Sequence, residues 1–425
     1  MAIVRCIRSI LPIGVLLALL AFFGIPAAHA QQAEPATQPA PAAPAVQPAP
    51  APSAPALQPS PVQQMASTLG SIRLNYAFQL YWQSRNTGSG PDKTETTTDI
   101  YFKRDRLMLG GQLDDVYGFY AAFQFMGDER VFPTAVSDST TKNFDVIDTF
   151  FTADYTDAFR LRAGLTKDPM IREQNESCFV PLSLDRSNFD YTNLARLNRD
   201  FGLILWGNLA DAKFQYRVAA MKGNDDVNDP KSNLRYTARV HVSLLDPEYS
   251  LVYNGTYLGK KKVLTVGAGY QTESEAVYGN VAAKDMVKDY KAYTYDVFFE
   301  YPTPGGTITA SGAYLKADFD KAYQGADPDP RSIGVNGDKS GWYAKVGYLL
   351  PNTKLQLFGR YEKWRFAELS GIFDQQITWT GYGINYYVRG QDLRLTFEYS
   401  KNDYDKEDTL NKDFNTMTFM LQFRI

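Results

Sequence analysis

The chain of 425 residues contains very little cysteine and histidine. Its cysteines are Cys6 and Cys178, and Cys6 lies in an N-terminal segment that we expect to be removed, so an intrachain disulfide framework is excluded. Its histidines are His29 and His241, and His29 lies in the same segment. One remaining histidine makes histidine-dependent catalysis or a zinc site hard to build. We therefore expect no enzyme activity, no bound metal and no cofactor.

The sequence also lacks an excess of basic charge and, after residue 30, any apolar run of the roughly 18 residues that a membrane-spanning helix needs. Without the two arginines of the N-terminal segment it holds 42 basic and 47 acidic residues, a net charge of −5. This balance gives no support to nucleic-acid binding. The mature chain is therefore either a soluble protein or one that spans a membrane as a β-barrel.

Residues 1–30 have the organisation of a secretory signal peptide. Two arginines give a positive start, residues 10–25 form an apolar stretch, and Ala28-His29-Ala30 is an A-x-A cleavage site. Residues 31–70 follow as a Pro/Ala-rich segment with almost no charge. We predict a disordered periplasmic tether, which is either a flexible spacer or a contact with peptidoglycan or a periplasmic partner.

Aromatic residues are abundant, with 28 Tyr and 26 Phe, although the mean hydropathy is only −0.33. The end of the chain shows how both are possible, because apolar and polar residues alternate there. One face of this strand carries Met417, Phe419, Leu421, Phe423 and Ile425, and the other carries Thr416, Thr418, Gln422 and Arg424. An outer-membrane β-barrel requires this alternation, since its outside meets lipid and its inside meets water.

Tight turns alternate with long polar connections between residues 71 and 425. The tight turns are 113–116, 156–158, 210–212, 302–306, 351–353 and 389–391, and the long connections are 84–98, 128–145, 168–200, 224–232, 273–289, 318–339, 367–376 and 403–411. Residues 249–258 look like a strand, but strict alternation is kept only if 246–262 is one long periplasmic turn. We predict an all-β fold, a transmembrane antiparallel barrel of 16 strands, with 14 and 18 as alternatives. A soluble β-sandwich has the same two-residue period but is less expected to repeat it so often.

The alternation also sorts strand residues into those that face lipid and those that face the lumen. The basic residues predicted to line the pore are Arg73, Arg160, Arg162, Lys213, Arg217, Arg235, Arg239, Lys354, Arg360 and Arg394. The predicted inward acids are Asp296, Glu300, Glu362 and Glu398. One arc of the wall is thus expected to be positive. Either these arginines only solvate a wet lumen and bridge neighbouring strands, or they form an electrostatic filter that favours anions.

The longest connection, 168–200, has the position and length of a loop that folds inward and narrows a channel. The charged residues that we assign to this constriction loop are Arg172, Glu173, Glu176, Asp185, Arg186, Asp190, Arg196 and Arg199. The loop holds four basic and six acidic residues, so facing an arginine-lined wall it would create a transverse field. The alternative is a surface-exposed loop. Cys178 is expected to be a buried thiol or to pair between chains.

Three blocks of the sequence resemble the phosphate-selective porin O and P family. The first runs from Gly164-Leu165-Thr166-Lys167-Asp168-Pro169 through Asp185-Arg186-Ser187-Asn188 to Arg199-Asp200-Phe201-Gly202, with Met170 and Asp185 in place of the family's Phe and Glu. The others are 346–362 and 382–400. The resemblance covers roughly residues 160–425. It implies a 16-stranded, homotrimeric outer-membrane channel, and phosphate-binding members use clustered Arg and Lys in the lumen and on the loop.

We therefore expect an outer-membrane porin of a Gram-negative bacterium, embedded in lipid, that passes small hydrophilic solutes with a weak preference for anions such as phosphate. One alternative is a barrel that sheathes a partner, such as a multihaem cytochrome of an electron-transfer conduit. The chain has no C-x-x-C-H haem motif, so any haem would belong to that partner. A hydrolase would need a Ser-His pair, and His241 is predicted to lie in the middle of a strand.

Overall fold

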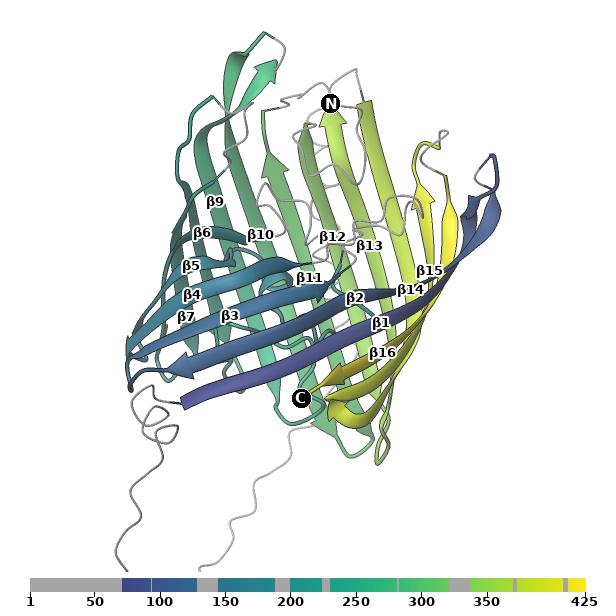
Figure 1. The fold of residues 1–425 in the computed structure, drawn as a ribbon, viewed down its shortest axis with the longest axis horizontal. Coiled ribbons are helices and arrows are strands. Elements are labelled where there is room, and N and C mark those ends of the chain that lie inside the picture. The colour runs from purple at the N-terminus through teal and green to yellow at the C-terminus, as the bar shows by residue number, and fades with distance from the viewer. Residues whose placement is uncertain are drawn as a thin grey trace, which may run out of the picture. The chain divides into compact units, whose positions relative to one another are not determined.

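A computed structural model describes residues 71–92, 94–127, 144–187, 199–223, 230–280, 283–320, 337–369, 373–407 and 412–425. Within these residues it contains sixteen strands in one closed antiparallel barrel, which confirms the predicted fold class and strand number (Figure 1). The predicted signal peptide (1–30) and tether (31–70) lie outside the described residues. No helix in the described residues is long and apolar enough to cross a membrane.

Each strand pairs with its neighbours in chain order, and the last strand returns to the first. The strands are β1 (Ser71–Ser89), β2 (Glu95–Gln112), β3 (Tyr117–Met126), β4 (Asp145–Thr156), β5 (Phe159–Lys167), β6 (Arg199–Leu209), β7 (Phe214–Met221), β8 (Arg235–Ser243), β9 (Val263–Asn280), β10 (Asp285–Thr303), β11 (Gly306–Asp318), β12 (Asp338–Leu349), β13 (Leu355–Leu369), β14 (Phe373–Gln391), β15 (Leu393–Tyr404) and β16 (Phe414–Arg424). Tyr76 and Ile425 close the ring through two backbone hydrogen bonds of 3.0 and 2.9 Å.

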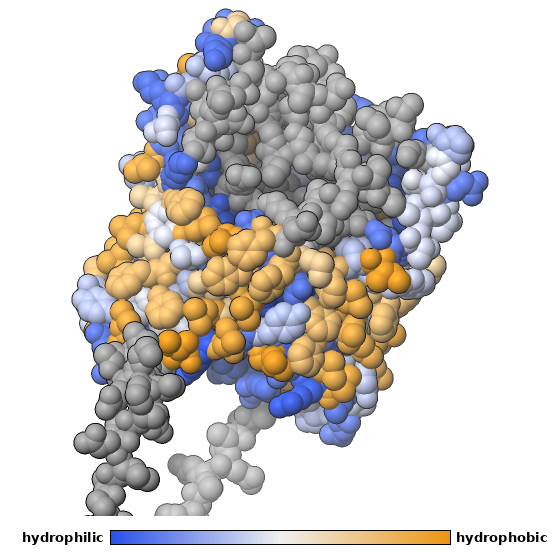
Figure 2. Space-filling model, viewed as in Figure 1, coloured by the Kyte–Doolittle hydropathy of each residue, from blue (hydrophilic) through white to orange (hydrophobic). Residues whose placement is uncertain are grey.

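The predicted two-residue period is clearest in β8. Arg235, Thr237, Arg239, His241 and Ser243 are all buried inside the barrel, and the residues between them are exposed on its outside. In β16, Phe419 is exposed on the outside while Gln422 is fully buried. Figure 2 shows the result as a band of hydrophobic side chains across the outer face, with hydrophilic residues along the lower rim. Such a band is the surface that a barrel presents to lipid.

Several connections are shorter than the sequence predicted because the strands continue past the bilayer. Residues 84–98 were expected to be a loop, but β1 extends to Ser89 and β2 starts at Glu95. Residues 273–289 were also expected to be a loop, yet only 281–284 join β9 to β10. The β9–β10 hairpin projects above its neighbours on the left of Figure 1. Polar residues do not end a strand there, because beyond the hydrocarbon both faces can be wet.

The depth of a residue in the lipid-facing band should decide how it tolerates charge. Val240 lies on the outer face near the middle of β8, and Leu234 lies just before this strand; both are exposed. We expect Val240→Arg to lower the free energy of unfolding by about 2–4 kcal/mol and Leu234→Arg to lower it by about 1 kcal/mol or less. Denaturant unfolding in lipid vesicles measures both. Equal losses at the two positions would contradict the assignment of this face to lipid.

Candidate functional site

The segment between β5 and β6 passes through the inside of the barrel. Residues 168–187 include a short 3₁₀ helix, η1 (Glu173–Asn175), and all but two of their side chains are buried. Of the two placements that the sequence left open for this loop, its described part takes the inward one. Asp190 and Arg196 lie outside the described residues.

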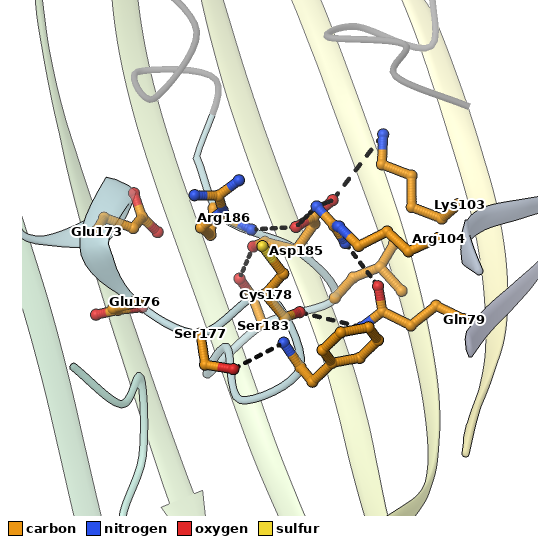
Figure 3. Close-up of polar contacts among 12 residues, drawn as sticks. Gln79, Lys103, Arg104, Glu173, Glu176, Ser177, Cys178, Ser183, Asp185 and Arg186 are labelled. Atoms are coloured by element: carbon orange, nitrogen blue, oxygen red, sulfur yellow. Dashed lines mark hydrogen bonds and ion pairs between the residues drawn. The ribbon is translucent and has the colours of Figure 1, made fainter. Parts of the chain in front are cut away.

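One side of the loop is tied to the strands that close the barrel (Figure 3). Asp185 accepts two hydrogen bonds from Arg104 of β2, at 2.9 and 3.0 Å, and its carboxylate is 4.0 Å from Lys103. Arg104 also donates to Gln79 of β1 at 2.6 Å, and Gln79 donates to the carbonyl of Cys178 at 3.1 Å. This chain of contacts fixes the loop near residues 178 and 185.

The strands next to β1 in the ring, β16 to β13, also hold the loop by its backbone. The carbonyls of residues 179, 181 and 182 accept hydrogen bonds from Gln422 of β16 (2.9 Å), Arg394 of β15 (2.9 Å) and Asn385 of β14 (2.8 Å). Arg360 of β13 donates to the carbonyl of Arg186 at 3.3 Å and forms ion pairs with Glu362 and Glu398. A buried carbonyl needs a donor, and here inward side chains of the wall supply it.

Three predicted pore-lining arginines are buried against partners on β7, β8 and their neighbours. Arg235 pairs with Glu273 at 2.9 Å, and Arg239 pairs with Asp296 at 2.6 Å. Arg217 donates to Gln215 at 2.9 Å and lies with its guanidinium 4.3 Å from the centre of the Tyr253 ring. The side chain of each is 1% exposed or less. In this part of the wall the arginines bridge neighbouring groups.

Arg160 and Arg162 of β5 lie on a more open part of the wall. The Arg160 side chain is 22% exposed and pairs with Asp157 at 2.6 Å. Arg162 is partly exposed, donates to Thr166 at 3.2 Å, and lies 4.0 Å from the centre of the Phe150 ring. Arg199, which we assigned to the loop, is the first residue of β6 and pairs with Asp148 at 2.9 Å.

Three predicted pore-lining residues lie elsewhere, which corrects the assignment. Lys213 and Lys354 directly precede β7 and β13, are exposed, and donate to the carbonyls of Leu245 and Val388. Arg73, close to the start of β1, is also exposed. The alternation rule assigns a side chain to the lumen or to lipid only when its residue lies well inside a strand. These three residues lie in turns or at the rim, where a long side chain reaches water.

The sequence analysis missed the basic residues of β2. Lys103, Arg104 and Arg106 are all buried, and Arg106 donates to Gln124 of β3 at 2.8 Å. The pairing of β2 with β1 shifts by one residue here, since Gln79 faces Arg104 but Leu80 faces Phe102. This irregularity, of the kind produced by a β-bulge, leaves Lys103 without an opposite residue. The alternation rule therefore failed to assign these basic residues of β2 to the interior. The sign of them in the sequence is the charged run Lys103-Arg104-Asp105-Arg106.

The basic residues beside Cys178 and Asp148 form a cluster that we call the basic arc. Its members are Arg104, Arg106, Arg162, Lys167, Arg186 and Arg199. Asp185 and Asp148 pair with two of them, whereas Arg106, Arg162 and Lys167 donate to uncharged oxygens. Burial would raise the pKa of the Cys178 thiol, but Arg186 and the neighbouring cations outweigh burial and hold the pKa well below its usual range. The thiol thus reports a positive local potential.

The acidic residues in the described part of the loop, 168–187, lie in anchoring contacts, not across an open lumen as the transverse-field hypothesis expected. Glu173 pairs with Lys345 of β12 and accepts from Ser187. Asp168 accepts from Thr237 of β8 at 3.0 Å and from Gln271 of β9 at 2.7 Å. A buried carboxylate is costly unless it is paired, so the loop uses its acids to hold its own position.

The model of the family described as phosphate-selective porin O and P matches residues 75–425. No curated protein matches the chain significantly.

Solved structures that match include several outer-membrane channels. An anion-selective porin from Comamonas acidovorans is 9% identical, with a TM-score of 0.53 over 84% of this chain and 99% of that one. The channel DcaP of Acinetobacter baumannii is 15% identical, with a TM-score of 0.53 over 83% and 97%. Salmonella typhi OmpF, solved with daunomycin, is 11% identical, with a TM-score of 0.56 over 84% and 99%. At these identities the likeness concerns the fold alone.

The charge of the loop should depend on pH through Glu176. Burial, and then the nearby Glu173, raise the pKa of Glu176 to about 8, although Arg172 acts in the opposite direction. Glu176 is thus protonated at pH 7 and gains a negative charge as the pH rises through about 8. We expect any preference for anions, measured from reversal potentials in planar bilayers, to fall between pH 7 and 9. Glu176→Gln should flatten this change, and an unaltered pH profile in that variant would contradict the assignment.

Proposed function

Because the chain belongs to the phosphate-selective porin O and P family, we propose that it is an outer-membrane porin whose water-filled channel passes small hydrophilic solutes and prefers anions such as phosphate. The basic arc is the observation that carries the preference. Six basic side chains gather beside Cys178 and Asp148, and two of them form ion pairs with Asp185 and Asp148. Fixed positive charge raises the local concentration of anions and repels cations.

The position of the arc supports a role in permeation. Its members come from β2, β5, β6 and the loop, while the loop's backbone is held by β14, β15 and β16, which follow beyond β1 in the ring. Arg162, Lys167 and Arg199 each keep some exposure to solvent. An ion that passes between the loop and the wall of β2 to β6 would therefore meet these three side chains.

The occupied interior argues against the alternative of a barrel that sheathes a partner. Loop 168–187 contacts β8 on one side of the barrel and β15 on the other, and most of its side chains are buried there. A cytochrome threaded through the lumen would have to displace this loop and break its ion pairs. Passive diffusion of small solutes requires no such rearrangement and no catalytic residue.

We further propose that the porin is a homotrimer, that residues 1–30 are a cleaved signal peptide, and that residues 31–70 form a periplasmic tether. Membership of the family supports the trimer. The Pro/Ala-rich composition supports the tether. Cross-linking of the purified protein in detergent, followed by denaturing gels, tests the trimer directly.

Charge removal from the basic arc tests the anion preference. Arg162→Ala and Arg106→Ala should each lower the anion/cation permeability ratio by up to about fivefold, because a unit charge about 8 Å from an ion in a water-like dielectric contributes roughly 0.5 kcal/mol, favourable for an anion and unfavourable for a cation. Arg160→Ala, whose charge is paired with Asp157, should have a smaller effect. Reversal potentials should be measured near 0.1 M salt, where screening acts only beyond about 10 Å.

Two variants provide matched controls for these measurements. Lys213→Ala and Lys354→Ala remove the same charge from exposed turns, so they should leave the permeability ratio close to that of the unaltered protein. If Arg106→Ala and Arg162→Ala also leave the ratio unchanged, the basic arc does not select anions.

A further inference from the structure

The connection between β8 and β9 is far longer than joining two adjacent strands requires. It runs from Leu244 to Lys262, whereas β4 and β5 are joined by two residues. Most of its central side chains are not at the rim: Glu248, Leu251, Tyr253 and Thr256 are each 2% exposed or less. The stretch 246–262 is thus a turn between strands, as predicted, but one that folds up into the lumen. We call it the periplasmic insert.

The insert is attached to the wall of the barrel by apolar and polar contacts. Leu251 packs into a buried cluster with inward-facing residues of β6 and β7, among them Ile204 and Trp206. Glu300 of β10 accepts hydrogen bonds from the backbone of residues 257 and 259 at 2.9 and 2.8 Å and from Thr256 at 2.9 Å. These contacts place the insert on the wall formed by β6 to β10.

The insert is also joined to loop 168–187 through its backbone. Tyr253 forms a parallel β-bridge with Glu176, donates to the carbonyl of Asn175 at 3.1 Å, and accepts from the amide of Ser177 at 3.0 Å. Gly255 donates to the carbonyl of Val180 at 2.9 Å. A Cβ on Gly255 would lie 2.7 Å from the amide nitrogen of Leu182, so only glycine allows the two backbones to approach this closely.

A buried ion pair also joins the loop to the insert. Arg172 of the loop donates to both carboxylate oxygens of Glu248 in the insert, at 2.7 and 2.8 Å, and Tyr257 donates to the same carboxylate at 2.6 Å. The side chains of Arg172 and Glu248 are 0% and 1% exposed. The Arg172 guanidinium also lies 4.4 Å from the centre of the Tyr253 ring. Removing one partner of such a pair leaves the other charge buried and uncompensated, which is strongly unfavourable.

We propose that the periplasmic insert is a second constriction element, and that Glu248 is the positioning residue that holds loop 168–187 across the lumen through Arg172. The insert closes the space beside the loop from the periplasmic end of the barrel. The loop enters from the other end of the barrel, where it connects β5 to β6. The two then act as one unit that sets the width of the channel. This inference rests on the proposed channel function, but not on its anion preference.

The barrel itself does not depend on this unit. Its sixteen described strands are held by a closed ladder of backbone hydrogen bonds, in which neither Arg172 nor Glu248 takes part. Loss of the ion pair should therefore loosen the part of the loop around Arg172, which keeps only its other anchors, while the barrel stays folded. The heat-dependent gel mobility of folded barrels checks that each variant has kept the fold.

Single-channel recording tests the proposal directly. Glu248→Ala and Glu248→Gln should replace the single conductance level of the unaltered protein by larger and fluctuating levels. Glu275→Gln is the matched control, because it breaks the exposed pair with Lys231, at 61% and 40% side-chain exposure, and should change nothing. If folded Glu248→Ala conducts as the unaltered protein does, the insert does not position the loop.

The only cysteine outside the predicted signal peptide gives a second readout that needs no channel activity. Cys178 lies in the loop, 4% exposed, and the surrounding basic side chains favour its reactive thiolate form once a reagent reaches it. We expect labelling of Cys178 by a bulky maleimide to be slow in the unaltered protein and at least about tenfold faster in Glu248→Ala, which corresponds to about 1.4 kcal/mol. Equal labelling rates would overturn the proposal.

A double-variant comparison shows whether the effect passes through Arg172. Arg172→Gln with Glu248→Gln should label no faster than either single variant if the two residues act only through each other, whereas independent roles would add. The two proposals fail in different ways. A silent unaltered protein would contradict the channel function but leave the labelling comparison intact, and a conducting protein insensitive to Glu248 would contradict only the present inference.

Discussion

The closed ladder of backbone hydrogen bonds is the constraint on which the rest of this structure depends. In lipid no water can satisfy a free amide or carbonyl, so a sheet must close on itself, as β1 and β16 do through Tyr76 and Ile425. Closure commits one face of every strand to lipid and the other to the interior. The abundance of aromatic residues at a low mean hydropathy follows from that division.

Closure also leaves a wide interior, and the backbone of any segment that enters it needs hydrogen-bond partners. A sixteen-strand barrel is too wide for its own side chains to fill, and a segment that enters it brings unpaired backbone groups with it. Arg394, Asn385 and Gln422 meet this need by donating to carbonyls of loop 168–187. Polar residues on the inner wall are therefore divided between those that hold the loop and those that remain available to solutes.

Much of the fold could be predicted from the sequence, because alternation and turn residues are local signals. The sixteen strands followed from them, whereas 249–258, which looks like a strand locally, was excluded because short turns and long loops must alternate around the barrel. Contacts inside the barrel are not local. Arg172 and Glu248 are separated by 76 positions, and nothing near either residue in the sequence identifies the other. The irregular pairing at Lys103 shows a different failure, since the alternation rule itself breaks where β2 and β1 shift register.

The distribution of charge explains why the composition of the loop was a poor guide to the field inside the channel. Counted along the sequence, the loop is acidic, and an acidic loop suggests a preference for cations. In the structure Glu173 and Asp185 are turned toward Lys345 and Arg104, so much of their charge is cancelled where they are anchored. Arg106, by contrast, donates to the neutral side chain of Gln124, and this contact does not cancel its charge. The sign of the field is thus decided by which charges are used as anchors, and that depends on the folded loop and not on its net charge.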